Sequence, residues 1–105
     1  MRKIHIAIGV LNIASSVEDY SRRLGCLPAV VISNEYALWR TSTINFSIRL
    51  DPNAPGALRH LGWEDSSVCE FTQDKDVNGI IWEQFNADQQ AKEIKDTWPL
   101  SKYIP

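Results

Sequence analysis

The two-residue alternation in residues 3–10 constrains the fold more than any other feature of the chain. Apolar β-branched residues occupy the four even positions, and the odd positions hold Lys3, His5, Ala7 and Gly9. This period places successive side chains on opposite faces of a β-strand. The segment therefore predicts a half-buried strand whose second face carries a histidine among small residues. The alternative is that this second face is simply solvated.

The remaining patterns predict six further strands and two helices. Ser15, with Glu18 three residues later, predicts a capped helix that ends at Gly25, and Asn86 with Gln89 predicts a second capped helix that ends before Pro99. Runs of β-branched and aromatic residues bounded by turn residues give the strands. The expected strands are residues 3–10, 29–33, 36–41, 44–50, 58–64, 68–73 (with one helical turn as the alternative) and 80–85.

These elements divide the chain into three consecutive parts within one α+β domain over residues 3–105. Residues 3–50 have the order β-α-β-β-β, and residues 57–85 form a shorter unit that starts with another histidine strand. Residues 86–98 form a C-terminal helix, and a loop rich in proline and glycine separates the two units. A chain of 105 residues buries about two-thirds of its unfolded surface in a single core.

Charge and hydropathy exclude several classes of function. The net charge of −2 arises from mixed signs without a basic block, so we expect no nucleic-acid binding. No apolar run has the length that a membrane span needs, and the basic pair before residue 4 only faintly resembles a signal peptide. Cys26 and Cys69 are far apart and in no metal-binding spacing. We therefore expect a cytoplasmic protein with reduced cysteines.

Three residues are candidates for a metal centre. His5 and His60 are the only histidines and lie on two different expected strands, and Glu83 lies on a third. Two imidazoles and one carboxylate are a ligand set that holds a divalent ion and leaves coordination positions open. If the strands bring them together they form a metal site; otherwise they are two surface histidines and one of several glutamates.

Several segments resemble the vicinal oxygen chelate superfamily, which includes glyoxalase I, fosfomycin- and bleomycin-resistance proteins and extradiol dioxygenases. The similarity covers roughly residues 3–85. It rests on His-Ile-Ala-Ile-Gly-Val at 5–10, the helix ending at 24–25, Arg-His-Leu-Gly-Trp-Glu at 59–64 and Asp-Val-Asn-Gly-Ile-Ile-Trp-Glu at 76–83. Such proteins pair two βαβββ units into a cup. The resemblance implies a curled mixed sheet, with His5, His60 and Glu83 as ligands of a divalent Mn, Fe, Zn or Ni ion.

The chain departs from this family in two respects. Glu83 follows His60 by only 23 positions, too few for the helix and the additional strand of a complete second unit. We therefore expect a truncated second unit, and a homodimer or the C-terminal helix to compensate for it. In addition, Ser47 and Arg49 stand where glyoxalase I has a fourth ligand, a glutamate, so a four-ligand isomerase site is not expected.

The resemblance implies a metal-dependent enzyme of lyase, dioxygenase or transferase type, acting on a small molecule with two adjacent oxygens. Arg49 is a candidate partner for a substrate carboxylate or phosphonate, with a surface ion pair as the alternative. Ser47, Tyr36 and Trp39 are candidate substrate contacts, although strand aromatics commonly belong to the core. The sequence does not identify the catalytic residue. The alternative function is metal-free sequestration of a small molecule, as in bleomycin-resistance proteins.

Overall fold

A computed structural model describes residues 1–105 and has the expected α+β architecture: a βαβββ unit, a truncated second unit and a C-terminal helix. Neither of the two helices has the length and hydropathy that a membrane-spanning helix requires. Seven strands and two helices make up the chain, in the order β1 (Arg2–Val10), α1 (Ile13–Leu24), β2 (Val30–Ile32), β3 (Tyr36–Arg40), β4 (Ile44–Leu50), β5 (Leu58–Asp65), β6 (Thr72–Lys75), β7 (Ile81–Phe85) and α2 (Ala87–Thr97).

All seven strands form one mixed sheet with the order β2-β3-β4-β1-β5-β7-β6. The two halves meet where β1 and β5 pair antiparallel. On either side of this seam the pattern repeats, because β4 is parallel to β1 and β7 is parallel to β5, and each is then joined by an antiparallel neighbour. The second half lacks only the helix and the outermost strand of the first. The truncation expected from the sequence is therefore confirmed.

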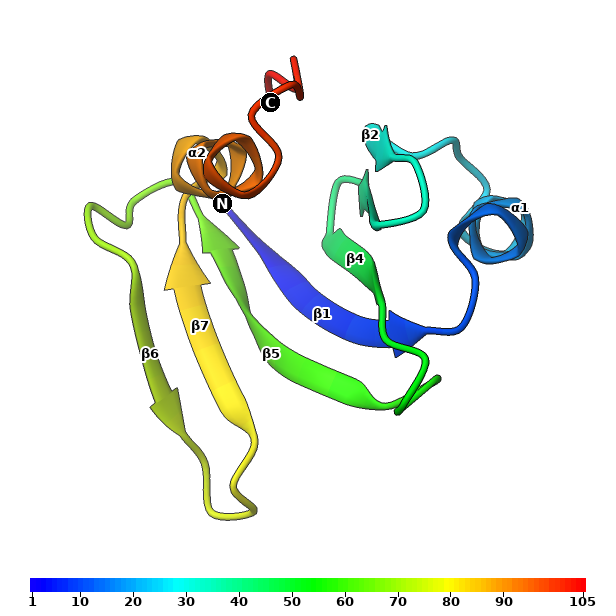
Figure 1. Cartoon of the computed structure of the whole chain (residues 1–105). Helices are drawn as coiled ribbons and strands as arrows, with labels where there is room; N and C mark the ends of the chain where they lie inside the picture. The colour runs from blue at the N-terminus through cyan, green and yellow to red at the C-terminus, as the bar shows by residue number, and fades with distance from the viewer.

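The sheet curls strongly, and the two helices lie on its opposite faces (Figure 1). Helix α1 packs outside the curve, and α2 lies over the concave side. Ile8 and Val10, at even positions of β1, pack in the core on the side of α1. The odd positions therefore lie on the concave face, where His5 lines a cavity together with residues of α2.

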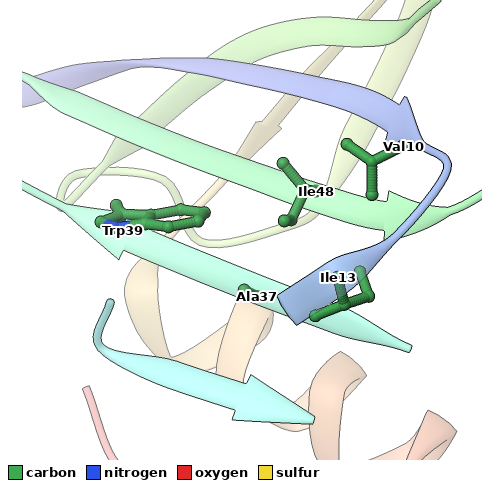
Figure 2. Packing of buried hydrophobic residues seen from close by; sticks show 5 residues of the cluster. All are labelled: Val10, Ile13, Ala37, Trp39 and Ile48. Carbon is green, nitrogen blue, oxygen red and sulfur yellow. The ribbon is translucent and has the colours of Figure 1, made fainter. Parts of the chain in front are cut away.

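The outer layer is a hydrophobic core between α1 and the first half of the sheet (Figure 2). It consists of five buried side chains, Val10, Ile13, Ala37, Trp39 and Ile48. The Trp39 indole is fully buried and its Nε1 donates a hydrogen bond to Ser21 Oγ at 3.2 Å. The prediction that Trp39 contacts a ligand is therefore wrong, because this side chain lies on the face of the sheet away from the cup.

The N-cap of helix α1 lies three residues before the predicted one. Asn12 occupies the N-cap position, and its Oδ1 accepts a hydrogen bond from the Ser15 amide at 2.9 Å. Asparagine is as good an N-cap as serine, and this cap extends the helix so that Ile13 enters the core. The predicted end is confirmed, since Gly25 has φ 72° and follows the last helical residue.

The strand predicted over residues 68–73 is displaced toward the C-terminus and forms β6 at Thr72–Lys75. The cause is the N-terminus of α2. Asn86 Nδ2 donates to the Val68 carbonyl at 3.0 Å and Gln89 Nε2 donates to the Cys69 carbonyl at 3.0 Å. The carbonyl groups of Val68 and Cys69 therefore accept hydrogen bonds from the capping side chains of α2 and not from a neighbouring strand. The predicted capping box between Asn86 and Gln89 is present.

Gly62 permits β5 and β7 to approach closely. A Cβ atom at this position would lie 2.3 Å from the carbonyl oxygen of Glu83, which is main chain and has no room to move aside. On the concave face Gly62 also pairs with His5 on one side and Glu83 on the other. Its missing side chain therefore leaves space between these two residues.

Gly62→Ala is expected to lower the free energy of unfolding by about 3 kcal/mol, since the added methyl group collides with the backbone. Urea denaturation followed by fluorescence measures the loss. Gly79→Ala is the control. Gly79 has φ 79° and open space around its Cβ position, so this substitution costs only the left-handed strain of about 1–2 kcal/mol. Equal losses in the two variants would contradict the close approach at Gly62.

Candidate metal centre

His5, His60 and Glu83 come together on the concave face, each from a different strand of the sheet. His5 lies on β1, His60 on the neighbouring β5 and Glu83 on β7. The pairing register places His60 beside Ala7 and Glu83 beside Gly62, so both neighbours of the cluster are small. Their ligand atoms lie within 4.8 Å of one another. The sequence predicted this grouping only through the assumption that the two histidine strands are adjacent.

The ring nitrogens and the carboxylate oxygen of the cluster lie at hydrogen-bonding distances from one another. His5 Nε2 lies 2.9 Å from His60 Nε2, and His60 Nε2 lies 3.2 Å from Glu83 Oε1. Burial, with the neighbouring His5 and Arg59, lowers the pKa of His60 to about 4. Burial, together with Glu93, raises the pKa of Glu83 to about 7. Near neutral pH the contact therefore joins a neutral imidazole to a partly protonated carboxyl group. It is not an ion pair.

His5 is the most firmly held member of the three. It is buried, and burial lowers its pKa below the ordinary value. Its Nδ1 lies 2.8 Å from Asn45 Oδ1 and 3.2 Å from the Asn45 carbonyl oxygen, and its ring packs edge-on against Phe85. The asparagine on β4 and the aromatic ring together fix the orientation of the imidazole.

A buried polar layer continues from Asn45 to Glu64 and Arg40. Asn45 Nδ2 donates to Glu64 Oε1 at 2.8 Å and to Gln90 Oε1 at 2.7 Å. Arg40 donates to both oxygens of Glu64, at 2.8 and 2.9 Å. Burial alone would raise the pKa of Glu64, but the hydrogen bonds from Arg40 and Asn45 outweigh it and hold that pKa below its ordinary value. Glu64 is therefore an ionised, fully paired carboxylate.

The cluster lies at a cavity of about 50 Å³ between the sheet and α2. At roughly 10–15 Å³ for each water, this holds about four water molecules. Thirteen residues line it: His5, Tyr36, Ser47, Arg49, Arg59, His60, Glu83, Phe85, Gln90, Glu93, Ile94, Thr97 and Trp98. Three of the four predicted substrate contacts, Tyr36, Ser47 and Arg49, are among them; Trp39 is not.

Arg59, Glu93 and Gln90 were not expected at this cavity. Regular alternation along a strand puts neighbouring residues such as Arg59 and His60 on opposite faces. The pairing of β1 with β5 is irregular between Ala7 and Ile8, however, and both Arg59 and His60 reach the cavity. A change of register of this kind has no signal in the local sequence. Glu93 and Gln90 reach the site only because α2 lies over the cup.

The arrangement is compatible with a divalent ion. Imidazole nitrogens and carboxylate oxygens bind Zn²⁺ at about 2.0–2.2 Å, which places neighbouring ligand atoms about 3–3.6 Å apart. The separations of His60 Nε2 from His5 Nε2 and from Glu83 Oε1, 2.9 and 3.2 Å, are close to this range, and all three ligand atoms lie within 4.8 Å of one another. Both imidazoles are neutral near pH 7, as ligation requires. The residues present therefore fit such an ion.

Comparison with known proteins does not place the chain in a family. No protein-family model matches the sequence, and no curated protein matches it significantly.

Arg40→Met is expected to lower the free energy of unfolding at pH 7 by about 3 kcal/mol, because it leaves the Glu64 carboxylate buried without its cation. The folded-state pKa of Glu64 is lowered, so its contribution is complete above the unfolded value of about 4.5 and is lost as the pH falls through the lower folded value. Urea denaturation at pH 7 and pH 3 measures the difference between variant and wild type, which is expected to shrink in acid.

Lys92→Met is the matched control for this experiment. Lys92 pairs with Asp96 on the exposed face of α2, where both side chains are more than half exposed. Its removal is expected to change the free energy of unfolding by less than about 1 kcal/mol. A loss in Arg40→Met that is equally small, or that stays constant between the two pH values, would contradict the account of Glu64.

Proposed function

We propose that this protein is a divalent-metal-dependent enzyme that acts on a small molecule with two adjacent oxygen atoms, within the vicinal oxygen chelate superfamily. The convergence of His5, His60 and Glu83 at the floor of a cavity is the observation that carries the proposal. The order of strands about the β1–β5 seam supports the relationship to that superfamily, because each half repeats the same pairing pattern. The reaction class remains lyase, dioxygenase or transferase.

The two imidazoles and the carboxylate would hold Mn, Fe, Zn or Ni and leave positions open for substrate. An ion bound there supplies Lewis acidity to the substrate oxygens. The protein's own contribution is to hold the ligands on three hydrogen-bonded strands, which fixes their spacing before substrate arrives. Phe85 and α2 cover the cluster and limit the access of water.

Charged and hydroxyl side chains around the cluster give the cavity its selectivity. Arg49 and Arg59 supply two guanidinium groups, which suit a carboxylate, phosphate or phosphonate. Burial raises the pKa of the Tyr36 phenol, so its hydroxyl remains a hydrogen-bond donor, and the buried Ser47 hydroxyl also lines the cavity. The small volume favours a compact anionic substrate, and it argues against the alternative of sequestering a bulky antibiotic.

Metal binding is tested with purified protein incubated separately with Mn²⁺, Fe²⁺, Ni²⁺ and Zn²⁺, followed by elemental analysis. Wild-type protein is expected to retain about one equivalent of one of these ions. His60→Ala and Glu83→Gln are each expected to lose more than about 90% of it, since an open site with two protein ligands binds weakly. Circular dichroism confirms that the variants are folded.

Glu18→Gln is the control, because this glutamate is exposed on α1, on the other face of the sheet. It is expected to retain metal like the wild type. Wild-type protein that retains none of the four ions would contradict the enzyme proposal. The chain would then be treated as a metal-free binding protein and tested by thermal stabilisation with small anions.

We also propose that the protein is a homodimer, with the second copy covering the outer face of the shortened half. This face has no helix, whereas α1 covers the corresponding face of the first half. Trp63 and Trp82 lie on it half-buried, and they line a shallow groove there together with Asp74, Asp76, Glu83 and Gln84. Arg2 stacks on Trp63 at 3.9 Å. A basic and two acidic side chains beside exposed parts of two indole rings suit a self-complementary contact.

Analytical ultracentrifugation over a hundredfold range of concentration tests the oligomeric state. The wild type is expected to sediment as a dimer, and Trp82→Asp to sediment as a monomer because a carboxylate in the contact is desolvated. Val77→Asp, in the exposed turn between β6 and β7, is the control and is expected to remain dimeric. A wild type that is monomeric at the highest concentration would remove the proposal.

A further inference from the structure

A chain of hydrogen bonds joins Arg40, Glu64, Asn45 and His5. In each of these bonds the chemistry of the two groups determines which one donates. A guanidinium only donates and an ionised carboxylate only accepts. Glu64 therefore accepts from Arg40 and also from Asn45 Nδ2 at 2.8 Å. The second hydrogen of Asn45 Nδ2 is donated to Gln90 Oε1 at 2.7 Å. Both amide hydrogens of Asn45 are thus used away from His5, and its Oδ1 faces the imidazole.

The acceptors beside His5 determine which ring nitrogen carries hydrogen. Asn45 Oδ1 lies 2.8 Å from His5 Nδ1, and the Asn45 carbonyl oxygen lies 3.2 Å from the same atom. Both can only accept, so the hydrogen must be on Nδ1. A neutral imidazole has a single N–H, so hydrogen on Nδ1 leaves a lone pair on Nε2. That atom points at His60 and Glu83.

We infer that Arg40, Glu64 and Asn45 form a hydrogen-bond relay that fixes His5 as the Nδ1–H tautomer and directs its Nε2 lone pair into the cluster. Asn45 and Glu64 are positioning residues, because they act through His5. The use of this lone pair for metal binding depends on the proposed function, whereas the tautomer itself does not.

The two histidines differ in this respect. If His5 Nε2 accepts, the hydrogen in the 2.9 Å contact between the two imidazoles belongs to His60 Nε2. His60 Nδ1 has no hydrogen bond to a protein group, so nothing holds that tautomer when another group competes for Nε2. The fold therefore fixes the tautomer of His5, whereas the tautomer of His60 can change.

Nuclear magnetic resonance of ¹⁵N-labelled, metal-free protein at pH 7.5 tests the relay. Long-range ¹H–¹⁵N correlations distinguish a protonated from an unprotonated ring nitrogen for each histidine. Wild-type His5 is expected to show protonated Nδ1 and unprotonated Nε2, and His60 the reverse. Hydrogen on His5 Nε2, or an averaged signal from both tautomers, would overturn the inference.

Substitutions that keep the side-chain volume nearly constant distinguish the effect of the hydrogen-bond relay from the effect of packing. Asn45→Asp places a carboxylate against Glu64 and is expected to lower Tm by about 10 °C. Adding Glu64→Gln exchanges the two polarities, because the introduced amide donates to the introduced carboxylate, which still accepts from His5 Nδ1. Gln90 Nε2 already donates to position 45, at 3.2 Å, and the Gln90 amide turns to present this group to the carboxylate. The double variant is expected to recover Tm and the wild-type His5 signals. Failure of the second change to rescue the first would overturn the relay.

Asn45→Leu removes the side-chain acceptor and is expected to give mixed tautomers at His5, with affinity for Zn²⁺ reduced about 10–100-fold. An unchanged His5 tautomer in this variant would assign the role to the main-chain carbonyl alone and overturn the relay. If this variant does not fold, the polarity exchange carries the test. A wild type with the expected tautomer but without metal affinity would contradict the proposed function and leave the relay intact.

Discussion

The antiparallel pairing of β1 with β5 joins the two halves of the sheet and brings together the only two histidines of the chain, 55 residues apart in sequence. Gly62 on β5 then lets β7 approach closely enough for Glu83 to reach the same point. The cluster is therefore a product of sheet topology, and its geometry is as rigid as the strand pairing that creates it.

The concave face is built mainly from polar groups, which requires that they be paired. His5, Asn45, Glu64 and Gln90 are all buried and form one connected set of hydrogen bonds. Leaving one such group unpaired costs about 1–3 kcal/mol, so the set specifies its own arrangement closely. Helix α2 takes part through Gln90 and packs Ile94 against Tyr36 and Leu38. The C-terminal helix is thus a wall of the site as well as a cover for the sheet.

Most of the fold could be predicted from periodicity, whereas the details of the site depended on tertiary contacts. Alternation and runs of β-branched residues located β1, β4 and β5. They could not indicate that Arg59 reaches the cavity beside His60, because the irregular pairing opposite Ile8 has no local signal. They left Trp39 open as a ligand contact, because an aromatic residue on a strand does not indicate which layer will cover it. The strand predicted at 68–73 was displaced by the cap of a helix that lies later in the chain.

The separation of the three cluster residues along the chain has a consequence for how the protein is made. Neither residues 1–50 nor residues 58–85 alone contain His5, His60 and Glu83 together. Contacts between distant segments form late in folding, because the chain must first lose the conformational entropy of the loop between them. During synthesis the cluster is therefore absent until the last strand has emerged from the ribosome. Until then the nascent chain presents the three side chains only as separate groups.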